Sequence, residues 1–210
     1  MSFESQSVAE FCAALASADP TPGGGTASAA AGAIGASLVS MVIALTLSRE
    51  KYRDAEPDLA PIAAEAGHAS SRLLELMQED AEAYDGMVAA RRLPKETEGE
   101  QEARTRAMAA AARRATEVPM ETALVAAGIL SRIALVVEKG NPNASSDAGV
   151  AALLLAAAAE GALLNVGINL TSISDAAFAG EMEKETAHIQ SEVERSSAQV
   201  IALVRKSFKK

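Results

Sequence analysis

The chain has 210 residues, of which 28 are acidic and 19 are basic, so its formal net charge at pH 7 is −9. This acidic balance argues against a nucleic-acid binder, because such proteins normally carry a basic surface. Aromatic residues make up only 3% of the chain, whereas alanine runs recur, so helix formers dominate and a β-rich fold is excluded.

Cysteine and histidine are too scarce to supply a thiolate site or a transition-metal centre. Cys12 is the single cysteine, and His68 and His188 are the two histidines. We expect Cys12 in the core, because it falls on the apolar face of a helix. The first residues lack the basic and apolar segments of a signal peptide, so we expect a cytoplasmic protein.

The first 47 residues predict two helices separated by a sharp break. Residues 7–15 form the first, an amphipathic helix that begins with a capping box of Ser7 and Glu10. Two prolines and three glycines between residues 20 and 25 then interrupt the pattern. Residues 20–48 carry no charge, and this stretch is long enough to cross a bilayer. Within it, residues 27–47 predict one long helix. Its small residues favour instead a helix buried in a bundle or a dimer, with no membrane partner.

The rest of the chain continues the helical pattern. A helix is expected after Pro57 and Pro61 to about Arg91, and a charged helix then leads to Pro119, which either kinks it or starts the next helix. An apolar stretch, a second charge-poor helix to about Leu170 and a final helix with heptad-like apolar spacing follow.

These elements predict an all-α fold, with residues 1–210 as a single domain built as a bundle of about six or seven helices. The two charge-poor helices, around Ile43 and Leu154, are more apolar than a monomer of this size usually hides. We therefore expect a homodimer that shares them.

Three polar islands, at residues 21–25, 49–52 and 141–147, interrupt the apolar helices and are the candidate sites. The glycines of the first could be a simple turn, but they would also let a flat ring or a carboxylate reach free N–H groups at a helix start, and we favour binding. Spacing alone favours Lys51 as a solvated cation and Asp147 as an N-cap. Asp80 and Tyr84 could share a pocket wall, but rim and core positions are the simpler interpretation.

Six blocks of sequence occur in an order that resembles the cyclodeaminase/cyclohydrolase family between residues 11 and 178. The blocks are Asp19-Pro20-Thr21-Pro22-Gly23-Gly24-Gly25, Lys51-Tyr52, Leu93-Pro94-Lys95, Lys139-Gly140-Asn141-Pro142-Asn143, Ser146-Asp147-Ala148-Gly149-Val150 and Asn165-Val166-Gly167-Ile168-Asn169-Leu170. One block departs from the family, which often has three lysines before the tyrosine where this chain has Arg49-Glu50-Lys51.

The resemblance implies an all-α homodimeric enzyme that acts on a tetrahydrofolate derivative. One family activity is methenyltetrahydrofolate cyclohydrolase, which opens 5,10-methenyltetrahydrofolate with water to 10-formyltetrahydrofolate. The other is formimidoyltetrahydrofolate cyclodeaminase, which releases ammonia and forms the methenyl compound. A free-standing chain without a transferase domain favours the cyclohydrolase. A non-enzymatic helical scaffold is a third interpretation, and it explains the polar islands poorly.

The resemblance also implies roles for residues of the blocks. Asp147 is expected beside the substrate cation as a proton shuttle. Lys51, if desolvated beneath the small-residue helix, is expected either as its acid/base partner or as the group that holds the water. Lys139, Lys95 and Arg49 are the expected cations for the anionic folate tail. Folate is the substrate, so neither a metal nor a cofactor is expected. The expected substrate-binding residues are Thr21, Pro22, Gly23, Gly24, Gly25, Tyr52, Asn141, Asn143, Ser146, Asn165 and Asn169.

Overall fold

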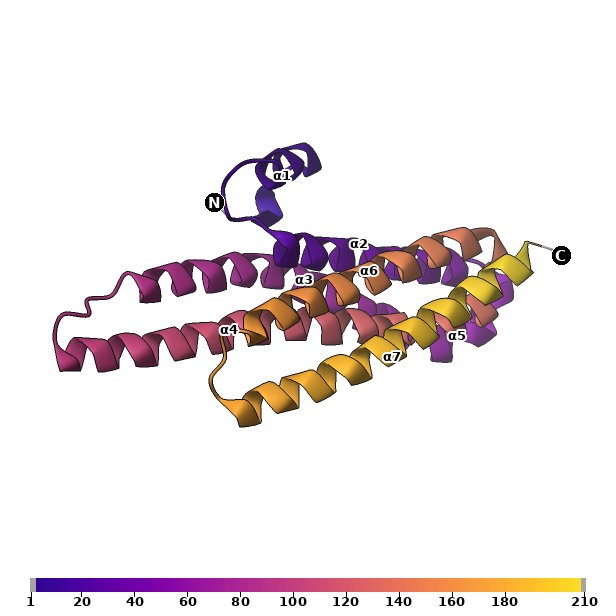
Figure 1. Cartoon of the computed structure of the whole chain (residues 1–210). Helices are drawn as coiled ribbons and strands as arrows, with labels where there is room; N and C mark the ends of the chain where they lie inside the picture. Colours follow the sequence, from indigo (N-terminus) through magenta and orange to yellow (C-terminus); the bar gives the residue numbers. More distant parts are fainter. Residues whose placement is uncertain (1–2, 209–210) are drawn as a thin grey trace.

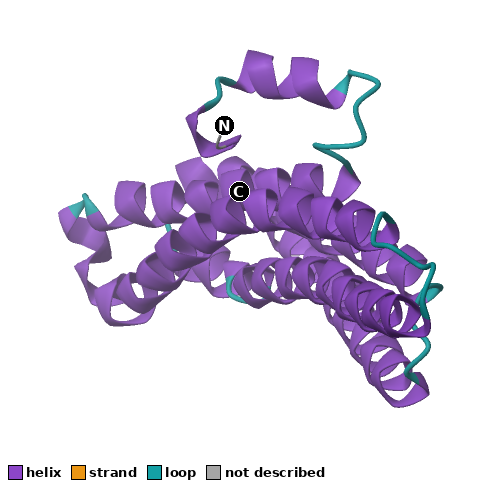
Figure 2. Cartoon of the chain, turned by 90° about the vertical axis from the view of Figure 1, so that its left-hand side faces the viewer, coloured by secondary structure: helices purple, strands orange, loops and turns teal. Residues whose placement is uncertain are grey.

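The computed structural model describes residues 3–208, and this part of the chain consists of helices joined by loops, with no strand (Figure 2). The α-helices are α1 (Val8–Leu15), α2 (Gly24–Leu47), α3 (Glu56–Arg91), α4 (Glu98–Leu130), α5 (Ile133–Lys139), α6 (Ser145–Leu170) and α7 (Ala176–Ser207). The short 3₁₀ helices are η1 (Phe3–Ser5), η2 (Glu50–Ala55) and η3 (Pro142–Ala144). The all-α prediction is confirmed.

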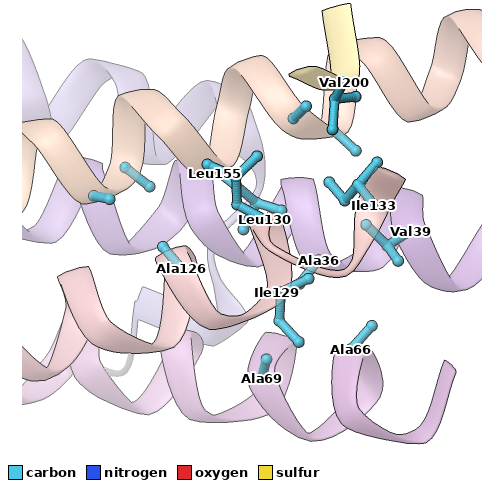
Figure 3. Packing of buried hydrophobic residues seen from close by; sticks show 14 of the residues in the cluster. Ala36, Val39, Ala66, Ala69, Ala126, Ile129, Leu130, Ile133, Leu155 and Val200 are labelled. Carbon is cyan, nitrogen blue, oxygen red and sulfur yellow. The ribbon is translucent and has the colours of Figure 1, made fainter. Parts of the chain in front are cut away.

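The long helices form one bundle, with α2 between α3 and α6, α4 against α3 and α6, and α7 along α6 (Figure 1). Helix α1 stands apart from the bundle, beside the start of α2. The main core runs through the middle of the bundle, where Val39, Leu130 and Leu155 are fully buried (Figure 3). Many core positions are alanine, which lets the helix backbones approach closely.

Helices α2 and α6 run antiparallel, and small residues hold them close along their length. A Cβ on Gly35 would lie 2.8 Å from Cγ of Leu155, and one on Gly161 would overlap the hydroxyl of Ser28. At the far end, the Asn141 N–H donates to Thr46 Oγ1 at 2.9 Å. The start of α2 therefore lies beside the end of α6, and the end of α2 lies beside η3 and the start of α6.

Several sequence-based boundaries need correction. Helix α2 begins at Gly24 rather than at residue 27, because two of the glycines form its first turn. Pro119 neither starts a new helix nor ends α4; the break comes later, at Ser131 and Arg132. The prediction that Cys12 is a core residue is wrong, because Cys12 is exposed and α1 has no buried residue. The capping box of Ser7 and Glu10 is confirmed.

By length and composition, three segments could cross a membrane: Gly24–Leu47, Glu98–Lys139 and Pro142–Leu170. These segments carry α2, α4 to α5, and α6, which pack against one another in the bundle. Part of their apolar surface therefore serves the core, and the absence of a membrane partner stays a prediction.

Candidate active site

A pocket of about 450 Å³ opens where the start of α2, the end of α6 and the facing sides of α3 and α4 meet. Its polar groups come from separate helices and converge on one space, which is typical of a small-molecule site. Its main lining residues are Thr21, Gly23, Gly24, Gly25, Asp80, Tyr84, Met87, Arg91, Ala115, Asn165, Ile168 and Asn169.

The first turn of α2 presents its backbone to this pocket. Gly23 is the N-cap and provides no side-chain cap, so α2 relies on other groups to bond its first N–H groups. Gly24 and Gly25 line the pocket in this turn, at the positive end of a 24-residue helix. The prediction that these glycines form a binding surface and not only a turn is therefore consistent with their position.

Asp80 is the carboxylate of the pocket. The Thr26 hydroxyl donates to Asp80 Oδ2 at 2.8 Å. A Cβ on Gly25 would overlap Asp80 Oδ1, so the glycine is needed for the carboxylate to fit against α2. Burial raises the pKa of Asp80, and the hydrogen bonds from the hydroxyl and the backbone N–H of Thr26 only partly oppose this rise.

A carboxyl group whose pKa is raised holds a proton more readily than an ordinary one, which suits acid/base catalysis. The sequence interpretation of Asp80 as a rim residue and Tyr84 as a core residue is wrong: both line the pocket, and Tyr84 is exposed. Asp80 is thus a candidate functional residue that the sequence alone did not single out.

Asn165 and Asn169 lie one turn apart on α6 and place two amide groups on the same pocket wall. Asn165 Nδ2 donates to the Gly161 carbonyl at 2.8 Å, and Asn169 Nδ2 donates to the Ala115 carbonyl at 2.5 Å. Each amide nitrogen uses one of its two N–H groups within the protein, which fixes the orientation of the amide and makes Oδ1 a candidate acceptor for N–H groups of a bound ring.

The other expected site residues gather at the opposite end of α2 and α6 and do not line this pocket. Lys51 Nζ lies 4.7 Å from the centre of the Tyr52 ring. Asn141 is buried, whereas Asn143 and Ser146 are exposed. Asp147 lies in the first turn of α6, whose N-cap is Ala144, so the N-cap interpretation is wrong.

Within one chain, these two groups of residues are far apart. Asp147 and Asn165 are separated by five turns of α6, which is about 27 Å. Among the residues from 3 to 208, no hydrogen bond or ion pair joins Lys51 to Asp147. One chain therefore brings together Thr21, the three glycines, Asn165 and Asn169, but not Lys51 or Asp147; Pro22 is buried next to the pocket without lining it.

The cations expected for the folate tail also lie elsewhere. Lys139 forms an ion pair with Asp58, and neither Lys95 nor Arg49 lines the pocket. Arg91, at the end of α3, is the one basic side chain in the pocket lining. In residues 3–208, no three His, Cys, Asp or Glu side chains gather into a group that could hold a metal ion.

Comparison with protein families identifies the family of this chain. Residues 7–188 match the family model described as formiminotransferase-cyclodeaminase. The chain belongs to this family. The resemblance that the six sequence blocks indicated is confirmed, and it extends over most of the described bundle.

Among the relatives of this formiminotransferase-cyclodeaminase family member, one is named as a cyclohydrolase and others as cyclodeaminases. The methenyltetrahydrofolate cyclohydrolase of Methylorubrum extorquens is 41% identical over 180 residues, which cover 86% of each chain. The crystal structure of formiminotetrahydrofolate cyclodeaminase from Thermotoga maritima aligns with a TM-score of 0.86 at 31% identity, covering 97% of this chain and 98% of that one. The formimidoyltransferase-cyclodeaminase of Gallus gallus is 31% identical over 93% of this chain but only 36% of its own length.

Proposed function

We propose that this chain is a methenyltetrahydrofolate cyclohydrolase, which opens 5,10-methenyltetrahydrofolate with water to give 10-formyltetrahydrofolate. The observation that carries the proposal is the partly buried Asp80 carboxylate in a pocket with backbone and amide hydrogen-bonding groups. The 41% identity to a relative of that name favours this activity over the cyclodeaminase, whose solved representative is 31% identical.

Asp80 would act as the acid/base group. In this mechanism its ionised form takes a proton from water as the water oxygen bonds to the amidinium carbon. The proton then passes to the ring nitrogen as the carbon–nitrogen bond breaks, and the hydroxyl proton of the adduct leaves to solvent. The negative carboxylate also favours the cationic substrate in this partly buried site. The reaction consumes only water and the folate, and we expect it to proceed without a metal or a cofactor.

We propose that the protein works as a homodimer that uses one continuous apolar face. This face, here called the α2–α6 face, consists of Ile34, Met41 and Leu45 of α2 and Val150, Leu153, Leu164 and Ile168 of α6, all exposed in the single chain. The exposed fraction reaches 76% for Leu164 and 64% for Ile168, which is costly to leave in water. A second copy supplies an apolar surface of matching composition.

The dimer would complete the site. A twofold axis that lies in the α2–α6 face, perpendicular to its helices, reverses the helix direction between the subunits. The pocket end of one subunit then meets the end of its partner that carries Lys51 and Asp147. This arrangement would account for the division of the family blocks between the two ends of the face. In it the partner's Asp147 would pass the hydroxyl proton of the adduct to solvent, with the partner's Lys51 as its acid/base partner.

The activity is tested by absorbance with the purified protein. Loss of the 5,10-methenyltetrahydrofolate chromophore faster than in buffer, with no ammonia released from 5-formimidoyltetrahydrofolate, is the expected result. Ammonia release with appearance of the chromophore would instead establish the cyclodeaminase. Inactivity toward both compounds would contradict the proposed function and favour the helical scaffold.

We expect Arg91→Ala to raise the KM for the folate by about tenfold and to change kcat little, because Arg91 is the cation in the pocket lining and suits the glutamate carboxylates. Steady-state kinetics on substrates with and without the glutamate group provide the measurement. Arg92→Ala is the matched control, since Arg92 is the next residue and does not line the pocket. Equal effects of the two variants would contradict a specific role for Arg91.

A further inference from the structure

Thr26 differs from the other buried threonines in the partner of its hydroxyl. Thr46, Thr116 and Thr122 donate to the carbonyl four residues earlier in their own helices. Thr26 is fully buried as well, but its hydroxyl donates across the helix interface to Asp80 Oδ2, 54 residues away in the sequence. The residue four before Thr26 is Pro22, which precedes α2, so the usual helical acceptor is missing.

The bond between Thr26 and Asp80 joins α2 to α3, and both helices contribute residues to the pocket. Thr26 lies in the first turn of α2, and its backbone N–H also bonds the carboxylate, so Asp80 caps α2 from a neighbouring helix. As a β-branched residue with no exposed surface, Thr26 has little rotamer freedom. On the other side of the carboxylate, Oδ1 lies against Gly25, where no side chain intervenes.

We propose that Thr26 is a positioning residue for Asp80: its hydroxyl holds Oδ2 so that Oδ1 faces the substrate from the wall formed by Gly25. Without this bond the carboxylate can rotate toward the space that the hydroxyl leaves. The inference rests on the proposed function, in which Asp80 transfers the proton.

The surroundings of Asp80 make Thr26 its dominant polar neighbour. The pocket lining contains two other titratable or charged side chains, Tyr84 and Arg91, and both belong to α3. From α2, α4 and α6 the lining includes no charged group. The two hydrogen bonds from Thr26 oppose the effect of burial on the pKa of Asp80, so loss of the hydroxyl raises that pKa further.

The test compares Thr26→Val, Thr26→Ser and Thr122→Val by pH-dependent steady-state kinetics on 5,10-methenyltetrahydrofolate. Thr26→Val removes the hydroxyl and keeps the shape, and we expect kcat to fall by about tenfold to a hundredfold with KM changed little. The acid limb of its pH–rate profile is expected to move to higher pH. Thr26→Ser keeps the hydroxyl and is expected to keep the wild-type limb. Thr122→Val is the matched control, since Thr122 is equally buried but bonds within α4.

An unchanged acid limb in Thr26→Val, or equal losses in Thr26→Val and Thr26→Ser, would overturn the inference. If Thr26→Val does not fold, Thr26→Ala takes its place.

A carbon-13 NMR titration of the Asp80 carboxyl, assigned with Asp80→Asn, provides a readout that needs no turnover. We expect the pKa of Asp80 to be higher in the variant without the hydroxyl, and an unchanged pKa would overturn the inference. An inactive wild type with the expected NMR shift would contradict the proposed function alone.

Discussion

Asp80→Asn is expected to lower kcat for 5,10-methenyltetrahydrofolate hydrolysis by about 10²- to 10⁴-fold, the usual contribution of an acid/base group. Asparagine keeps the size of the side chain and can still accept a hydrogen bond from Thr26, but it cannot take up a proton. The loss should therefore appear in kcat more than in KM. The measurement is steady-state absorbance kinetics at saturating substrate.

The same substitution is expected to leave stability unchanged or to increase it at neutral pH. Burial raises the pKa of Asp80, so the folded protein holds this proton more tightly than the unfolded chain does. Stability is then lost as the pH rises from the unfolded pKa, about 4, through the higher folded one. Asparagine avoids that loss, so the melting temperature of the variant should equal or exceed that of the wild type at pH 7, and the difference should close near pH 4.

Asp85→Asn is the matched control for this prediction. Asp85 lies five residues later on α3, is exposed and does not line the pocket. We expect wild-type kinetics from this variant. Equal activities of Asp80→Asn and Asp85→Asn would contradict the catalytic role of Asp80, and a large fall in the melting temperature of Asp80→Asn at pH 7 would contradict the pKa argument.

The sequence predicted the helices well because their signals are local. The capping box of Ser7 and Glu10 and the apolar spacing of α7 involve residues within a few positions of one another. Pro119 was harder to interpret, because its effect depends on packing: it is buried in α4, and the helix continues through it. The cytoplasmic location and the absence of a metal or cofactor stay predictions.

The candidate site was only half predictable, because the role of Asp80 depends on contacts that are distant in the sequence. In the acidic stretch from Glu79 to Asp85, one carboxylate looks like the next. Asp80 differs because it faces Gly25 and Thr26 on another helix. One local signal was available: three successive glycines at a helix start indicate that a neighbouring group occupies the space of a side chain.

Lys51 and Asp147 do not line the pocket of their own chain, so a site shared between subunits should allow two different variants to complement each other. Two inactive variants, Asp80→Asn and Asp147→Asn, are expected to recover activity when both chains are present in one dimer. The proposed site combines Asp80 of one subunit with Asp147 of the other, so a mixed dimer contains one site with both native residues and one with neither. Mixed dimers should therefore have about half of the wild-type activity per dimer.

The experiment uses coexpression of the two variants with different affinity tags, followed by purification through both tags. The matched control pairs Asp147→Asn with Lys51→Ala. Lys51 and Asp147 lie at the same end of the α2–α6 face, so each site of that mixed dimer lacks one of the two groups and no activity should return. Recovery in the control, or no recovery with Asp80→Asn in a mixed dimer that has been verified by mass, would contradict the shared site.

Leu153→Arg is expected to prevent dimer formation without unfolding the single chain. Leu153 is 55% exposed in the single chain and lies on the α2–α6 face far from Asp80, so arginine there should not disturb the bundle or the pocket. In the proposed dimer the same position is buried against the partner, where an unpaired charge is strongly unfavourable. Sedimentation is expected to show a folded monomer, and the assay to show little activity. A fully active monomer would mean that one chain contains the whole site, and that Lys51 and Asp147 have no part in it.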